Sequence, residues 1–389
     1  MARGNNRDSL MMKIVRTILF AGLFTLFANG QDPNRKPNDV TGKFFIPPLE
    51  KVGQGALLKR EFIYPLDQRP EASAHASTIV ETPSGLVAAF FAGPYEKHPD
   101  VGIRVSRYQD GEWTYPVEVA NGFHNDTLRY ATWNPVLFLP KEGPLHLFYK
   151  EGPNPRDWWG MVKTSDDDGK TWSYARKLGE NDKIGHLLGP VKNKPFQLPD
   201  GTILHPSSSE RIEDGEVIWR VHFEKTDPSG NNWEVIGPIN DGVAFDAIQP
   251  SILHFPDGRL MILARTRQGV LGQSWSNDNG KTWREIKAID LPNPNSGTDA
   301  VTLKDGRHLL IYNHKLRTKA NRGRDLLNLA LSEDGVHWTP VMTIENEASE
   351  HGYAYPAIIQ AADGLVHATY TYNRESVKYI LIDPSKLGR

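Results

Sequence analysis

Residues 250–283 read PSILHFPDGRLMILARTRQGVLGQSWSNDNGKTW, and this stretch decides the fold. Two apolar runs, Pro250–Phe255 and Leu260–Ala264, flank the turn Pro256-Asp257-Gly258. This arrangement predicts an antiparallel hairpin, because glycine reaches the positive φ that a tight turn needs. A second turn, Ser276–Trp283, follows the hairpin. The whole stretch therefore predicts one antiparallel unit of four strands.

The glycine turn recurs six times along the chain. Its glycines stand at positions 85, 143, 201, 258, 306 and 364, at intervals of 58, 58, 57, 48 and 58 residues. A repeat of this length that is built from short alternating strands is typical of a propeller. We therefore predict an all-β, six-bladed β-propeller with four-stranded antiparallel blades over residues 56–389.

The second turn recurs as well, with the pattern S-x-D-x-G-x-T-W at Ser165–Trp172 and Ser276–Trp283 and a shorter copy at Ser332–Trp338. Its Asp accepts backbone N–H groups, its Gly bends the chain and its Trp packs beside the turn, so we assign it a structural role. The pattern resembles the Asp-box of the sialidase-like (BNR repeat) superfamily. The resemblance spans roughly Glu71–Asp383 and implies the same six-bladed propeller.

The sixth blade must be completed from elsewhere in the chain. Only 25 residues follow Gly364, too few for its outermost strand. We expect Leu57–Tyr64 (LLKREFIY) to supply this strand and to close the ring, which removes an open sheet edge.

The N-terminus predicts export. Lys13 and Arg16 precede the apolar run Thr17–Phe27, and small residues follow at Ala28 and Gly30. This is the pattern of a cleavable signal peptide, which we place at residues 1–30, with an extended lead-in over 31–55. The run is too short to span a membrane. We therefore expect a periplasmic or secreted protein.

Composition excludes several classes of protein. The chain has 389 residues, a formal net charge of −2 and no cysteine. This balance gives no basis for binding nucleic acid or an anionic membrane. Without cysteine there is neither a disulfide nor a cysteine-linked lipid anchor. The histidines lack the spacing of metal ligands, so we expect neither a metal nor a cofactor, and we expect a monomer.

Strand direction predicts where a site lies. Both kinds of turn share one end of the propeller, so first strands start and second strands end at the opposite end, where polar and aromatic residues gather. Arg265 and Arg267, at i and i+2, suit a carboxylate or sulfate. The substrate-binding candidates are Trp133, Asn134, Lys192, Gln249, Arg265, Arg267, Asp299, Tyr372 and Arg374. The catalytic candidates are His75, Asp100, Lys150, Glu210 and Tyr355. Trp158 and Trp159 are either a sugar-stacking platform or a loop plug.

The resemblance implies roles for some of these residues. Sialidases hold the substrate carboxylate with three arginines, use a tyrosine paired with a glutamate as nucleophile, and use an aspartate as acid/base. Tyr355 stands where the sixth-blade tyrosine belongs, Arg265 fits the fourth-blade arginine, and Asp100 or Glu96 lies in the first-blade loop. The first-blade Arg-Ile-Pro motif is replaced by a segment that contains His75. The candidates for a further arginine are Arg322, Arg324 and Arg374.

Three functions fit this sequence. The first is an exo-glycosidase of sialidase type on a terminal acidic sugar, in which Tyr355 attacks or stabilises the anomeric centre, helped by Glu210, and Asp100 or Glu96 protonates the leaving oxygen. The second is β-elimination on uronic-acid-containing fragments by a lyase or dehydratase that uses His75, Lys150 and tyrosine. The third is a non-catalytic glycan-binding propeller.

Overall fold

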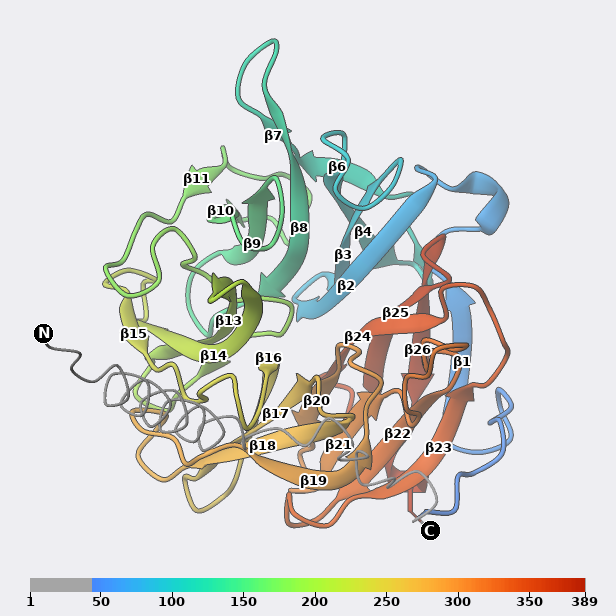
Figure 1. Cartoon of the computed structure of the whole chain (residues 1–389). Coiled ribbons are helices and arrows are strands. Elements are labelled where there is room, and N and C mark those ends of the chain that lie inside the picture. The colour runs from blue at the N-terminus through green and yellow to red at the C-terminus, as the bar shows by residue number, and fades with distance from the viewer. Residues whose placement is uncertain (1–43, 389) are drawn as a thin grey trace, which may run out of the picture. The chain divides into compact units, whose positions relative to one another are not determined.

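The computed structural model describes residues 44–388. The predicted signal peptide and most of the predicted lead-in lie outside the described residues. Six antiparallel sheets surround a central axis (Figure 1), which confirms the predicted all-β, six-bladed propeller. Between residues 44 and 388 no helix is long and apolar enough to cross a membrane.

Blades 1 to 5 are each built from consecutive strands, and blades 1 and 2 carry one short extra strand each, whereas blade 6 takes its outermost strand from the N-terminal part of the chain. Blade 1 contains β2 (Ser73–Thr82), β3 (Gly85–Gly93), β4 (Gly102–Gln109), β5 (Glu112–Trp113) and β6 (Val117–Ala120). Blade 2 contains β7 (Gly122–Phe123), β8 (Arg129–Phe138), β9 (Leu145–Gly152), β10 (Trp159–Ser165) and β11 (Arg176–Lys177). Blade 3 contains β12 (Phe196–Gln197), β13 (Ile203–Glu213), β14 (Glu216–Thr226) and β15 (Glu234–Ile236). Blade 4 contains β16 (Ala247–His254), β17 (Leu260–Thr266), β18 (Val270–Ser276) and β19 (Lys287–Pro292). Blade 5 contains β20 (Asp299–Thr302), β21 (His308–Tyr312), β22 (Leu327–Ser332) and β23 (Thr339–Glu345). Blade 6 contains β24 (Tyr353–Gln360), β25 (Val366–Tyr372), β26 (Ser376–Ile382) and β1 (Leu57–Phe62), and two short 3-10 helices, η2 (Leu66–Gln68) and η3 (Pro384–Lys386), lie outside the sheets.

Blade 6 is closed by the N-terminal strand, as expected. β1 pairs antiparallel with β26, and Leu57 on β1 is fully buried. The Asp383 amide donates to the Ala56 carbonyl at 2.9 Å and extends the pairing beyond the strand. The first and last long strands of the propeller therefore pair in one sheet, so β26 is not left as an unpaired edge strand.

The Asp-box turns have the structural role predicted for them. In the blade 4 copy the Asp278 carboxylate accepts the Thr282 amide at 2.9 Å and its hydroxyl at 2.6 Å. Trp283 stacks on Phe223 of blade 3, with ring centroids 4.3 Å apart. The turn therefore packs its aromatic ring against the preceding blade and helps to hold neighbouring blades together.

The innermost strands share a bulge that the sequence patterns did not predict. β2, β8, β16 and β24 each contain one extra residue relative to the partner strand. The first residue of each bulge has a positive φ: Ala76, Asn134, Gln249 and Tyr355. Proline follows three of them, at positions 135, 250 and 356, because a bulge is one of the few places where a strand tolerates it. Bulges re-aim side chains and are enriched near active sites.

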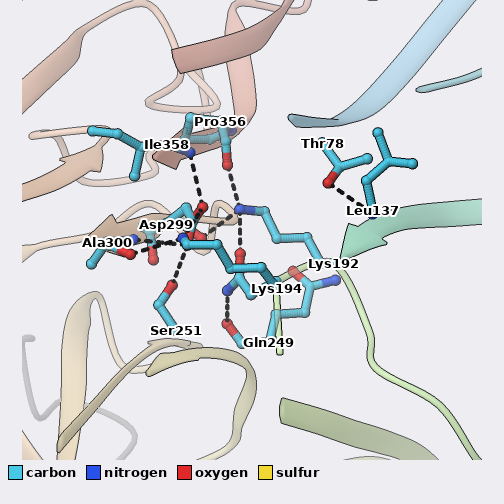
Figure 2. Close-up of polar contacts among 12 residues, drawn as sticks. Thr78, Leu137, Lys192, Lys194, Gln249, Ser251, Asp299, Ala300, Pro356 and Ile358 are labelled. Carbon is cyan, nitrogen blue, oxygen red and sulfur yellow. Dashed lines mark hydrogen bonds and ion pairs between the residues drawn. The ribbon is translucent and has the colours of Figure 1, made fainter. Parts of the chain in front are cut away.

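A polar hub joins the blades along the axis (Figure 2). The Asp299 carboxylate accepts hydrogen bonds from the Ser251 hydroxyl at 3.0 Å and from the Ile358 amide at 2.9 Å. Lys194 Nζ lies 2.8 Å from the same carboxylate. One buried carboxylate thus connects blades 3, 4, 5 and 6, which fixes the inner strands relative to one another.

Candidate functional site

Tyr355 lies at the centre of the candidate site. Its hydroxyl accepts a hydrogen bond from Arg265 Nη1 at 2.8 Å and one from Gln249 Nε2 at 3.2 Å. Arg265 Nη1 also donates to Gln249 Oε1 at 3.1 Å. Tyr355 and Gln249 both occupy the strained first position of a bulge, so two blades use the same backbone device to bring these groups together.

His75 on β2 packs against the Tyr355 ring, with ring centroids 4.3 Å apart. Its Nδ1 is 3.0 Å from the Thr371 hydroxyl. Burial holds the pKa of His75 well below its ordinary value, and the positive charges of Arg374 and Arg324 lower this pKa further. The imidazole is therefore neutral near pH 7.

Three arginines, Arg265, Arg324 and Arg374, are near enough to His75 for their charges to act on it. Burial lowers the pKa of Arg324 to about 10, and the nearby charges of Arg265 and Arg374 act in the same direction. Arg324 Nη2 donates to the Asn295 carbonyl at 3.2 Å, and Arg374 Nη1 donates to Glu96 at 2.6 Å. Cations that disfavour one another's charge form a centre that gains from binding an anion. Guanidinium groups match the geometry of a carboxylate.

Glu210 adds a carboxyl group beside the arginines. Its Oε2 accepts from Trp219 Nε1 at 3.1 Å, and the Arg265 guanidinium lies 5.0 Å from the Trp219 ring centre. Burial raises the pKa of Glu210, although the Arg265 and Arg267 charges oppose the shift. A carboxyl group with a raised pKa is suited to donate a proton.

The loop between β19 and β20 forms one wall of the site. A Cβ atom at Gly297 would lie 3.2 Å from the Tyr355 ring and 3.3 Å from Lys192 Cε. Only a residue without a side chain fits this approach at ordinary contact distance. The loop that the sequence predicts as a shaped rim thus lies directly against the central tyrosine.

Four further predicted residues form no hydrogen bond with Tyr355. Asp100 is exposed and accepts from Arg129 Nη1 at 2.6 Å. Arg267 pairs with Asp246 at 2.6 Å and covers the Trp219 ring, so Arg265 and Arg267 do not form one clamp. Arg374 is held by Glu96, and Asn134 occupies the bulge of β8. These residues can shape the rim, whereas Arg265 alone of the two strand arginines touches the tyrosine.

The structure places Lys150 away from the centre. Its buried Nζ donates to the carbonyls of Leu187, Leu188 and Gly189 at 2.6, 2.7 and 2.9 Å. Burial lowers the pKa of Lys150 to about 8, while Glu224 opposes the shift. Three carbonyls use all three donors of the ammonium, so these contacts give it a structural role in place of the catalytic one proposed from the sequence.

Lys192 and Asp299 also have structural roles. Lys192 Nζ donates to the carbonyls of Thr298 and Pro356 and to Asn193 Oδ1 (Figure 2). Burial lowers the pKa of Lys192 to about 7. Asp299 is the hub carboxylate described above. The sequence predicted that residues at the starts of first strands line the site. Some of these residues instead form the polar hub around Asp299, so position along the strand does not distinguish ligand-binding residues from hub residues.

Trp133 and Tyr372 pack within the protein. Trp133 is buried, and its Nε1 donates to the Gly152 carbonyl at 3.0 Å. Tyr372 packs edge-to-face on Phe62 of the closing strand, at 5.1 Å between centroids. Trp158 is buried against Trp133, which makes it a loop plug, while Trp159 is partly exposed. Burial corrects the assignment of Trp133 to the substrate, whereas Tyr372 is partly exposed and its assignment stays a prediction.

Sequence reasoning missed Trp219 and did not select Arg324 among three arginines. Trp219 lies directly opposite Glu210 in the β13–β14 hairpin, whose turn is Asp214-Gly215. This two-residue turn fixes the register and was the signal that could have found the pair. Arg324 lies in a long connection between β21 and β22, where no periodicity indicates which side chains turn inward.

Within residues 44–388 no cluster of three or more His, Asp or Glu side chains has the geometry to hold a metal ion. The acid and base groups found at the centre are His75, Tyr355 and Glu210.

Comparison with known proteins identifies the family. The chain matches the family model of the BNR repeat-like domain over residues 84–368 and belongs to this family. No curated protein matches the chain in sequence. A protein of unknown function from Dyadobacter fermentans is similar in structure, with 16% identity, TM-score 0.69, and coverage of 85% of this chain and 100% of that one.

Two sialic-acid-processing proteins are also similar in structure. One is the NanB sialidase from Streptococcus pneumoniae, with 12% identity, TM-score 0.65, and coverage of 88% of this chain and 71% of that one. The other is the intramolecular trans-sialidase from Ruminococcus gnavus, with 15% identity, TM-score 0.62, and coverage of 86% and 99%. At these identities the likeness is one of fold.

Proposed function

We propose that the protein is an enzyme that cleaves the glycosidic bond to a terminal acidic sugar of an oligosaccharide or polysaccharide. One observation carries the proposal: Arg265 donates to the Tyr355 hydroxyl at 2.8 Å and the His75 ring packs on the Tyr355 ring at 4.3 Å, while the charges of Arg324 and Arg374 act on His75. The arginines suit the carboxylate of the sugar, and the aromatic and amide groups suit its ring and hydroxyls. Membership of a sialidase-like family supports the same substrate class.

The first form of this reaction is exo-hydrolysis of sialidase type. The substrate carboxylate binds Arg265 and Arg324, which sets the anomeric carbon beside the Tyr355 oxygen. Glu210 donates a proton to the leaving oxygen as the glycosidic C–O bond breaks, and a water oxygen then bonds to the anomeric carbon while its proton returns to the Glu210 carboxylate. The raised pKa of Glu210 suits this role better than exposed Asp100, which is bound to Arg129.

A second form, β-elimination on a uronic acid, is favoured by a specific observation. The Tyr355 hydroxyl contacts an amide and a guanidinium, not the carboxylate that would activate a tyrosine nucleophile. In this form the arginines neutralise the uronate, neutral His75 removes the proton at C5, and the C4–O bond breaks. Tyr355 gives its proton to the leaving oxygen, and a 4,5-unsaturated uronate forms.

Product analysis tests the proposal. The purified protein is incubated with sialosides and with uronic-acid oligosaccharides, and mass and ultraviolet absorbance are followed. Gain of one water across the two products indicates hydrolysis, and new absorbance of an unsaturated uronate indicates elimination. Tight binding of unchanged glycan would show instead a non-catalytic glycan-binding propeller. Absence of both turnover and binding with every acidic glycan would contradict the proposal.

Export remains part of the proposal, because residues 1–30 lie outside the described part of the chain. A periplasmic or secreted enzyme would meet polymeric glycans before their uptake, which fits an exo-acting role.

A further inference from the structure

A cavity of about 400 Å³ lies beside the central site. It is lined by two connecting segments, residues 317–325 between β21 and β22 and residues 348–352 between β23 and β24. We propose that this cavity binds a second anionic group of the substrate, a sulfate ester or a second carboxylate on the sugar next to the terminal one. This inference rests on the proposed function, because it needs a glycan in the central site.

The cavity carries positive charge that the protein does not neutralise. Arg317, Lys319 and Arg322 line it and are all exposed. None of the three forms an ion pair or a side-chain hydrogen bond within residues 44–388. Three cations in one concave surface without partners attract an anionic ligand and lose little on meeting it, since no existing pair has to break.

The two carboxylates that line the cavity, Asp325 and Glu350, are outnumbered by its cations. Asp325 lies 2.7 Å from Lys315 Nζ and accepts from Asn321 Nδ2 at 3.0 Å, so its charge is already used. The Glu350 side chain is 82% exposed and lies 3.8 Å from His351 Nε2. The cavity is therefore cationic where Arg317, Lys319 and Arg322 face it.

The walls of the cavity are held by hydrogen bonds. The Gly323 amide donates to Asn321 Oδ1 at 2.7 Å, and the Gly352 amide donates to the Ser349 hydroxyl at 3.0 Å. The Tyr353 amide donates to the Arg324 carbonyl at 2.7 Å, which ties the cationic segment to the strand that carries Tyr355. A formed wall reduces the ordering cost of binding.

Arg324 connects the cavity to the central site. It lines the cavity, and its guanidinium is close enough to Arg265 and Tyr355 to feel their charges. The two anionic groups of a substrate therefore lie on either side of one arginine side chain. Such a separation fits adjoining sugars of one chain, so the preferred substrate carries acidic groups on both sugars.

The test compares matched disaccharides that share a terminal uronic acid. The second sugar is neutral, sulfated or a uronic acid, and binding is measured by calorimetry alongside kcat and KM. We expect the double variant Arg317→Ala/Lys319→Ala to bind the two doubly anionic disaccharides at least tenfold more weakly. KM should rise by a similar factor with kcat unchanged. Affinity for the disaccharide with the neutral second sugar should stay within twofold. Loss confined to the sulfated or to the diuronic probe identifies which anion the cavity takes.

A second double variant, Lys281→Ala/Lys287→Ala, controls for overall charge, because both lysines are exposed on blade 4. Equal losses in the two double variants would overturn the inference. A different outcome is that Arg317→Ala/Lys319→Ala cleaves the disaccharides and still prefers the doubly anionic ones as strongly as the wild-type protein does. That result would refute the inference and leave the proposed function intact. The reverse result, weaker binding of doubly anionic probes without turnover of any, would support the cavity and refute the enzymatic function.

Discussion

Gln249 distinguishes this site most clearly from a sialidase site, in which a glutamate pairs with the nucleophilic tyrosine. It holds the Tyr355 hydroxyl together with Arg265 and carries no charge. An amide leaves the positive charge of Arg265 available to the substrate, whereas a carboxylate would pair with it.

The variant Gln249→Glu tests this point. We expect KM for the acidic substrate to rise at least tenfold, because the new carboxylate competes with the substrate for Arg265. Steady-state kinetics measure the effect, and Gln249→Met controls for the lost amide without adding charge. A higher kcat in Gln249→Glu would mean instead that Tyr355 is a nucleophile awaiting a base.

Glu210 gives a prediction about pH. Its pKa is raised by burial, and a proton donor works only below its own pKa. Activity should therefore fall as pH rises through this raised pKa. We expect Glu210→Gln to lower kcat/KM about 100-fold at the acidic side and to remove this basic limb. A pH–rate profile that is the same in both proteins would exclude Glu210 as the acid.

At the scale of elements, β1 closes the ring. Leu57 is fully buried where β1 pairs with β26. We expect Leu57→Asp to destabilise the fold by about 3 kcal/mol or more, because a charge would enter the core. Urea denaturation measures the change, with Val52→Asp at an exposed position as the control. Equal stability of the two variants would show that closure by β1 contributes little.

The bulges show what could and could not be predicted at this scale. The glycine turns and Asp-boxes predicted the blades because both depend on local backbone chemistry. Pro250 begins an apolar run that the sequence predicts as a strand, whereas it follows a left-handed residue inside β16, as Pro135 does in β8 and Pro356 in β24. Proline is compatible with both positions, so the letters alone do not decide between them.

The candidate site was predicted less completely than the fold for a related reason. His75, Arg265, Gln249 and Tyr355 come from three different blades and meet through contacts between them. Lys150, Lys192 and Asp299 satisfy the same rule of position, yet they bond to backbone carbonyls or neighbouring blades. The repeat period predicts at which end of the propeller a residue lies. Whether that residue is available to a ligand depends on its burial and on the hydrogen bonds it makes within the protein.

At the scale of the whole molecule, the proposed reaction centre combines residues of blades 1, 4 and 6. Substitutions on separate blades should therefore damage the same activity. Tyr355→Phe removes one oxygen from blade 6, and His75→Ala removes an imidazole from blade 1.

The most direct measurement is kcat/KM of these two variants on whichever acidic oligosaccharide the wild-type protein cleaves, with thermal melts to establish folding. We predict that each variant loses at least about 100-fold in kcat/KM while remaining folded. Full activity in both folded variants would contradict the account, because the reaction centre would then lie elsewhere.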